Sequence, residues 1–223
     1  MEFKIENGPM FTTIRIMMRQ GEQFRAEAGA MVSMSPTIKL EAKTAGRGLM
    51  GTLKAAVGGE SFFATLFTAE TGDGELILAP GLPGDILKTD MRGETIYAEG
   101  GAYLAGSPGL EISAKGSFKA MISGEGLFLQ RISGTGILFL NSYGAIIEKT
   151  LAPAETYIVD TNHIVAFEET VQYRIKKAST GLFSTLASGE GLVCEYTGPG
   201  KMWIQTRALS AFAQLISKFI IKR

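Results

Sequence analysis

One pattern occurs three times along the chain, and this repetition restricts the possible folds more than any other feature. Each copy opens with a Gly-Glu or Ala-Glu pair, at residues 21, 93 and 154. Each copy then reaches a run in which apolar and polar residues alternate up to a lysine, at 38–43, 110–115 and 171–176. Side chains of a β-strand alternate between its two faces, so each run predicts a half-buried strand. We expect Leu40, Ile112 and Tyr173, the central apolar residues of the runs, to face inward at equivalent positions.

A second motif follows each run and repeats more plainly. It consists of a Gly-Glu pair, then a Gly-x-Gly sequence, then another apolar strand. Its residues are Gly59, Glu60, Gly72 and Gly74 in the first copy, Gly124, Glu125, Gly134 and Gly136 in the second, and Gly189, Glu190, Gly198 and Gly200 in the third. We interpret these residues as structural, with the glutamates accepting backbone N–H groups and each Gly-x-Gly forming a hairpin turn. The alternatives are a ring of carboxylates that binds a cation and, for Gly-x-Gly, a phosphate-binding loop; the latter would need a long helix to follow.

The repeats predict an all-β fold. Glycine contributes 28 of 223 residues, and turns between strands explain this excess. We expect three tandem β-domains of short double-stranded β-helix or sandwich type, at 1–92, 93–153 and 154–206. A C-terminal amphipathic helix is predicted at 207–223, with Leu209, Phe212, Ile216, Phe219 and Ile220 on its apolar stripe. Docking of this helix on the β-core is the favoured interpretation, and binding to a membrane surface or a partner is the alternative.

The composition argues against nucleic-acid binding and against most kinds of catalytic or metal site. The 22 basic and 22 acidic residues balance, which disfavours a nucleic-acid partner. A single Cys and a single His cannot form a disulfide or a usual zinc site. We interpret Cys194 as a buried inert thiol and His163 as structural, and we expect no catalytic, cofactor or metal residues and no enzymatic activity. The chain has no apolar run of signal-peptide or membrane-spanning type, which predicts a cytoplasmic protein.

The motifs resemble one protein family over essentially the whole chain. The stretch Ala28-Gly29-Ala30-Met31-Val32, the Gly-Glu-Gly-Leu motif and the Gly-x-Gly turns are similar to those of the family of altered inheritance of mitochondria protein 24. The resemblance implies three β-domains like those of the tryptophan RNA-binding attenuation protein, assembled as a homotrimer whose nine domains close a ring. Mitochondrial members are associated with inner-membrane organisation. The third copy departs from the pattern, with Asn162-His163 in place of Gly-Ala.

Three functions fit these observations. The leading hypothesis is a non-enzymatic, self-assembling scaffold or interaction protein. One alternative is a small-molecule-binding protein with sites between the β-domains, because domain junctions commonly form pockets. Another is a peripheral membrane-associated protein that uses the C-terminal helix.

Overall fold

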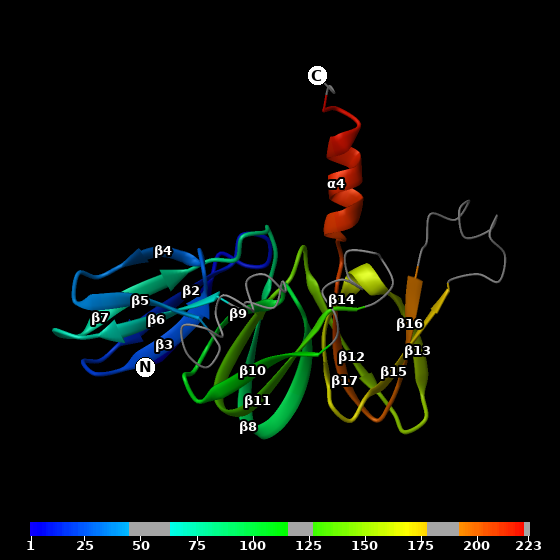
Figure 1. The fold of residues 1–223 in the computed structure, drawn as a ribbon, viewed down its shortest axis with the longest axis horizontal. Coiled ribbons are helices and arrows are strands. Elements are labelled where there is room, and N and C mark those ends of the chain that lie inside the picture. The colour runs from blue at the N-terminus through cyan, green and yellow to red at the C-terminus, as the bar shows by residue number, and fades with distance from the viewer. Residues whose placement is uncertain (45–62, 116–126, 178–191, 221–223) are drawn as a thin grey trace.

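The computed structural model describes residues 1–44, 63–115, 127–177 and 192–220. Antiparallel β-strands form three blocks that follow one another along the long axis, and one helix projects to the side of this row (Figure 1). The prediction of an all-β fold with a C-terminal helix is confirmed. Within the described ranges, no helix is both long and apolar enough to cross a membrane.

The first block contains seven strands. They are β1 (Glu2–Glu6), β2 (Thr13–Met18), β3 (Gln23–Glu27), β4 (Met31–Met34), β5 (Ile38–Thr44), β6 (Phe63–Ala69) and β7 (Gly74–Leu78). One sheet has the order β1-β2-β7-β4, and β3, β6 and β5 pair in that order in the other. Fully buried residues alternate with more accessible ones along β2 and β7, because one face of their sheet lies on the core.

The second block is built from two long strands and two short ones. They are β8 (Ile86–Glu99), β9 (Tyr103–Gly106), β10 (Leu110–Lys115) and β11 (Leu129–Asn141). The first half of β8 pairs with the second half of β11, which also pairs with β9. The second half of β8 pairs with the first half of β11, which also pairs with β10. The β8–β11 register shifts between Ser133 and Thr135, where the pair passes from one set of neighbours to the other.

The third block has six strands and a short 3-10 helix, η1 (Thr161–His163). The strands are β12 (Ile146–Leu151), β13 (Thr156–Asp160), β14 (Ile164–Glu168), β15 (Gln172–Lys177), β16 (Leu192–Thr197) and β17 (Gly200–Gln205). β17 lies between β12 and β14, and β16 lies between β13 and β15. The same pairing order therefore occurs in all three blocks when β8 and β11 are each counted as two strands and β1 is set aside, so that β2 counts as the first strand of its block. The tandem sequence repeat and the boundaries at 92, 153 and 206 stay predictions.

Each block has its own hydrophobic core, and each core includes residues of an adjacent block. The first contains Phe24 and Leu76 together with Phe139 of the second block. The second contains Ile132 together with Trp203 of the third block. Apolar packing therefore continues across both junctions, which stabilises the relative positions of the blocks.

The three residues expected to face inward differ in burial. They occupy corresponding pairs, Leu40 with Phe67, Ile112 with Ile132 and Tyr173 with Tyr196. Ile112 and Tyr173 pack against the cores of their blocks. Leu40 is 42% exposed, so the prediction is wrong for this residue. It lies on β5, the terminal strand of its sheet, and is not among the residues packed against the first core.

The C-terminal helix α4 (Leu209–Ser217) does not dock on the β-core. It projects from the β-blocks, and none of its residues is buried (Figure 1). Contacts with the β-blocks come from its first turn: Ser210 Oγ donates to Asn162 Oδ1 at 3.1 Å, and the Phe212 ring centroid lies 6.0 Å from that of Tyr143. The expectation of docking is wrong because contact at one end leaves the apolar stripe uncovered.

Candidate functional site

The Gly-Glu pairs of the repeated motif, Gly59-Glu60, Gly124-Glu125 and Gly189-Glu190, lie outside the described residues. Their interpretation as turn glutamates, and the alternative of a cation-binding ring, both stay untested. The leucines that follow the second and third pairs, Leu127 and Leu192, are described, and both line a cavity that is considered below.

The Gly-x-Gly sequences are not hairpin turns. Gly72 lies between β6 and β7, and Gly74 is the first residue of β7. Gly198 lies between β16 and β17, and Gly200 is the first residue of β17. The two strands of each pair belong to different sheets. Gly134 and Gly136 lie inside the single strand β11. The prediction failed because the apolar strands on the two sides of each glycine pair are not hydrogen-bonded to each other. The glycines mark corners at which the chain passes between sheets.

Close packing explains the second glycine of all three pairs, and a Cβ atom added at Gly136 would meet the side chain of Ser107. A Cβ atom added at Gly74 would lie 2.6 Å from Thr37 Oγ1, and one added at Gly200 would lie 2.5 Å from Thr170 Oγ1. Because real Cβ atoms do not approach other atoms so closely, a larger residue would displace the neighbouring loop. These glycines therefore have a structural role in the packing of each corner.

The same backbone contact recurs beside each corner. The amide of Glu75 donates to Ser35 Oγ at 2.9 Å, that of Ile137 donates to Ser107 Oγ at 2.9 Å, and that of Lys201 donates to Glu168 Oε2 at 2.8 Å. Each acceptor belongs to the end of the third strand or the turn that follows it. Because β7, β11 and β17 pair with β4, β9 and β14 in the same sheet, each bond extends the pairing of two neighbouring strands beside the corner.

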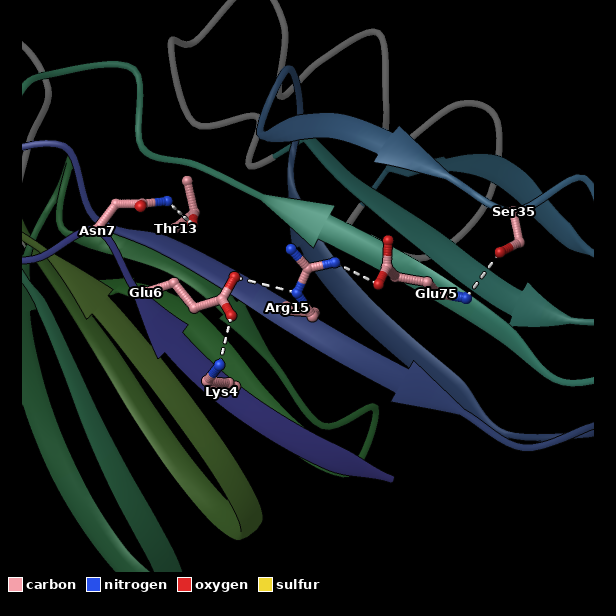
Figure 2. A network of polar contacts seen from close by, with 7 residues as sticks. All are labelled: Lys4, Glu6, Asn7, Thr13, Arg15, Ser35 and Glu75. Atoms are coloured by element: carbon pink, nitrogen blue, oxygen red, sulfur yellow. Dashed lines mark hydrogen bonds and ion pairs between the residues drawn. The ribbon is translucent and has the colours of Figure 1, made fainter.

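A polar network covers the outer sheet of the first block (Figure 2). Arg15 lies between Glu6, at 3.0 Å from Nε, and Glu75, and Lys4 Nζ lies 2.9 Å from Glu6. Hydrogen bonds from Lys4 and Arg15 lower the pKa of Glu6, and the bond to Glu75, with that to Glu6, raises the pKa of Arg15. All these charges are paired and solvent-accessible, so the network adds little stability and offers no reactive group.

His163 and Cys194, the side chains most suited to catalysis or metal binding, lie in structural environments. His163 Nδ1 lies 2.7 Å from the carbonyl oxygen of Gln205, and this contact connects η1 to β17. Cys194 is completely buried, and burial raises the pKa of its thiol. A thiol without access to solvent and with a raised pKa is a poor nucleophile. Among the described residues, no three His, Cys, Asp or Glu side chains gather as a possible metal site.

Strand pairing joins the blocks in the same way at both junctions. β9 of the second block pairs with β3 of the first, with Ala26 opposite Ala105. β14 of the third block pairs with β8 of the second, with Ala98 opposite Ala166. In each case the third strand of one block adds antiparallel to the second strand of the block before it. The junctions are thus heterologous and use equivalent edges.

Within the described chain, this arrangement leaves two edges unpaired. One is the third-strand edge of the first block, and the other is the second-strand edge of the third block. Counted from β2, β4 is the third strand of the first block, and among the described residues it pairs with β7 alone. β13 is the second strand of the third block, and its one described partner is β16. The two strands lie toward opposite ends of the long axis (Figure 1). Both carry exposed apolar residues, of which Val32 is 58% and Ile158 is 59% exposed.

An acidic residue ends the second strand of every block: Glu27, Glu99 and Asp160. Glu99 and Asp160 each accept a bond at 2.8 Å from the amide two residues later. Burial, together with the charge of Glu99, raises the pKa of Glu27 to about 7, and burial raises the pKa of Glu99. These residues were not among those predicted from the sequence. An acidic residue at one position of all three copies was the signal that could have revealed them.

A cavity of about 470 Å³ lies between the second and third blocks, at the base of α4. Glu99 and Asn141 come from the second block, whereas Thr161 and Gln205 come from the third. Apolar side chains contribute much of the remaining wall: Leu82, Ala102, Leu127, Phe128, Ile164, Leu192 and Leu209. The volume is within the range of small-molecule sites, which commonly combine apolar walls with a few polar groups.

The fold and site define an all-β protein of heterologously joined two-sheet blocks, with a cavity at one junction. The family model described as mitochondrial biogenesis AIM24 matches residues 3–207, and the chain belongs to this family. It is 31% identical to an uncharacterized protein of Streptococcus pyogenes serotype M6 over 229 residues, which cover 99% of this chain and 91% of that protein. A crystal structure of a Streptococcus pyogenes protein has a TM-score of 0.81 and 29% identity, covering 98% of this chain and 99% of the other. The predicted family is confirmed.

Proposed function

We propose that this protein is a non-enzymatic scaffold that assembles head to tail through β4 of one copy and β13 of the next. The observation that carries the proposal is the equivalence of these free edges to the edges that pair at the two internal junctions. An exposed strand edge with apolar side chains readily pairs with another strand, so a soluble protein must cover it. A closed ring covers both edges of every copy. The ring of three follows from the family resemblance.

The internal junctions define the register of the proposed contact. Tyr97 opposes Phe167 where β8 meets β14, and their ring centroids lie 5.5 Å apart. The corresponding residue of β13 is Ile158, and that of β4 is Met34. The proposed contact therefore places Met34 of one copy opposite Ile158 of the next, so that two exposed apolar side chains become buried. This burial would stabilise the assembly beyond the backbone hydrogen bonds.

A cysteine pair tests this register. Directly opposed Cα atoms of antiparallel strands are about 4.5–5.5 Å apart, a distance that a disulfide spans. Oxidation of Met34→Cys/Ile158→Cys is expected to produce covalent dimers and trimers on non-reducing gels, at multiples of the 23.9 kDa chain mass. Either single variant should remain monomeric on the same gel, and the buried Cys194 should not react.

The matched control moves one cysteine by a single residue. Met34→Cys/Tyr157→Cys places the second thiol on the opposite face of β13, because neighbouring side chains of a strand point to opposite faces. This pair should cross-link much more slowly. Equal cross-linking of the two pairs would contradict the register, and mass measurements of one chain at micromolar concentration would contradict assembly itself.

The exposed helix α4 favours a second function, attachment to an anionic membrane surface. Its large apolar residues are exposed, and so are the two that follow: Leu209, Phe212, Leu215, Ile216, Phe219 and Ile220. The sequence after Glu195 has no acidic residue and has five basic ones. Apolar side chains can enter the headgroup boundary of a bilayer while basic groups interact with anionic lipids, although one short helix binds reversibly.

Flotation with lipid vesicles tests this second function. The protein is expected to float with phosphatidylglycerol-containing vesicles and less with pure phosphatidylcholine vesicles. Phe212→Ser/Ile216→Ser should stay at the bottom of the gradient, whereas Ile147→Ser, which changes an exposed apolar residue on β12, should float like the unchanged protein. If the helix variant floats equally well, or if it instead loses its oligomeric mass, α4 does not act as a lipid anchor.

A further inference from the structure

Most hydrogen-bond donors around the cavity at the junction of the second and third blocks already bind acceptors within the protein. Gln205 Nε2 donates to the carbonyl of Asn162 at 3.0 Å, and Thr161 Oγ1 donates to that of Leu192 at 3.1 Å. Ser210 Oγ donates to the side chain of Asn162. A ligand in this cavity would therefore find few protein donors available.

Acceptor capacity is left at Glu99. Its Oε2 atom accepts the amide of Gly101 at 2.8 Å, whereas a carboxylate has about four acceptor positions on its two oxygens. The described residues that line the cavity include one acidic side chain and no lysine or arginine. A positively charged hydrogen-bond donor would complement both properties.

Much of the remaining cavity wall is apolar. Phe128 contributes its aromatic ring, and Ile164 and Leu192 contribute aliphatic side chains. Ile164 belongs to the third core and is buried, so its position is fixed by packing. An apolar wall of this kind favours the hydrocarbon part of a ligand over water.

We propose that this cavity binds a small organic ammonium, with its NH₃⁺ group on the Glu99 carboxylate and its apolar body against Phe128, Ile164 and Leu192. This ligand site goes beyond the assembly function, because it lies within one chain and involves neither β4 nor β13. The ammonium supplies the charge and the donors that the cavity lacks. Two residues that follow the repeated Gly-Glu pairs, Leu127 and Leu192, would thereby contribute to ligand binding.

Calorimetric titration with phenethylamine, cyclohexylamine and butylamine at pH 8 tests the site. At least one amine should bind saturably, and 2-phenylethanol, a neutral analogue of phenethylamine, should bind about tenfold more weakly or not at all. Glu99→Gln keeps the shape of the side chain but removes its charge, and it is expected to weaken amine binding about tenfold. Glu111→Gln, an exposed change on β10 outside the cavity, should leave binding unchanged.

A second variant separates ligand binding from folding. Leu192→Trp is expected to fill the cavity and abolish binding of both amines and alcohol, with no change in the mass of the assembly. Retention of amine binding in both Glu99→Gln and Leu192→Trp would overturn the proposal. So would the absence of binding by all three amines up to about 10 mM, well above the Kd of weak small ligands. Loss of assembly in Met34 or Ile158 variants would leave these results unaffected.

Discussion

Replacing Ile158 with lysine is expected to convert the assembled protein into single chains. In the proposed contact this side chain lies against Met34 of the neighbouring copy, where an ammonium group would have no partner. Leaving a buried charge unpaired costs roughly 3 kcal/mol or more, which is about a hundredfold in affinity. Light scattering coupled to size exclusion should therefore give a mass near 23.9 kDa, against about three times that value for the unchanged protein.

Ile147→Lys provides the matched control for this experiment. Ile147 is also an exposed apolar residue on a terminal strand, but it lies on β12, which takes no part in the proposed contact. Its lysine variant should keep the mass of the assembly. If both variants assemble equally, the β4–β13 contact does not form, and if both dissociate, the effect comes from added charge and not from the position.

Replacing Glu27 with glutamine is expected to stabilise the protein at pH 8 but not at pH 4.5. Burial, with the charge of Glu99, raises the pKa of Glu27 to about 7 from its ordinary value of 4.5. The folded state therefore holds the proton more tightly than the unfolded state, and the free energy of unfolding falls as pH rises between these values. The difference at pH 8 is on the order of 2 kcal/mol, since each unit of raised pKa corresponds to roughly 1.4 kcal/mol and solvent screening removes part of it.

Urea denaturation at pH 4.5, 6 and 8 measures this effect. The advantage of Glu27→Gln over the unchanged protein should grow with each step in pH. Glu111→Gln, which changes an exposed carboxylate on β10, should show no such trend. An advantage that is equal at all three pH values would mean that glutamine improves packing and that the carboxyl group of Glu27 does not hold a proton near neutral pH.

The strands were predictable because their signals are local. Alternation of apolar and polar residues placed strands at 38–43, 110–115 and 171–176, and the structure has β5, β10 and β15 there. The glycine pairs located the breaks between strands, but their interpretation as hairpins was wrong. A glycine shows where the backbone can bend, whereas the sheet that the next strand joins depends on contacts with distant segments.

Candidate sites were harder to predict, because each depends on convergence of residues that lie far apart. Glu99, Asn141 and Gln205 line one cavity although up to 106 positions separate them in the sequence. None of these three residues belongs to the repeated Gly-Glu and Gly-x-Gly motifs. The recurrence of an acidic residue at 27, 99 and 160 was visible, but its burial and its influence on a neighbouring carboxyl group required the packed junction.

The sequence by itself determined the family, the all-β class and the C-terminal helix, because motif spacing and side-chain periodicity are properties of neighbouring residues. Only the tertiary structure decided that each glycine pair is a corner between sheets, that α4 leaves its apolar stripe uncovered, and that β4 and β13 are free edges. It also decided that Glu99 faces a cavity. These features depend on which strands pair across the chain, and pairing is selected by the burial of whole faces against one another, which no local pattern specifies.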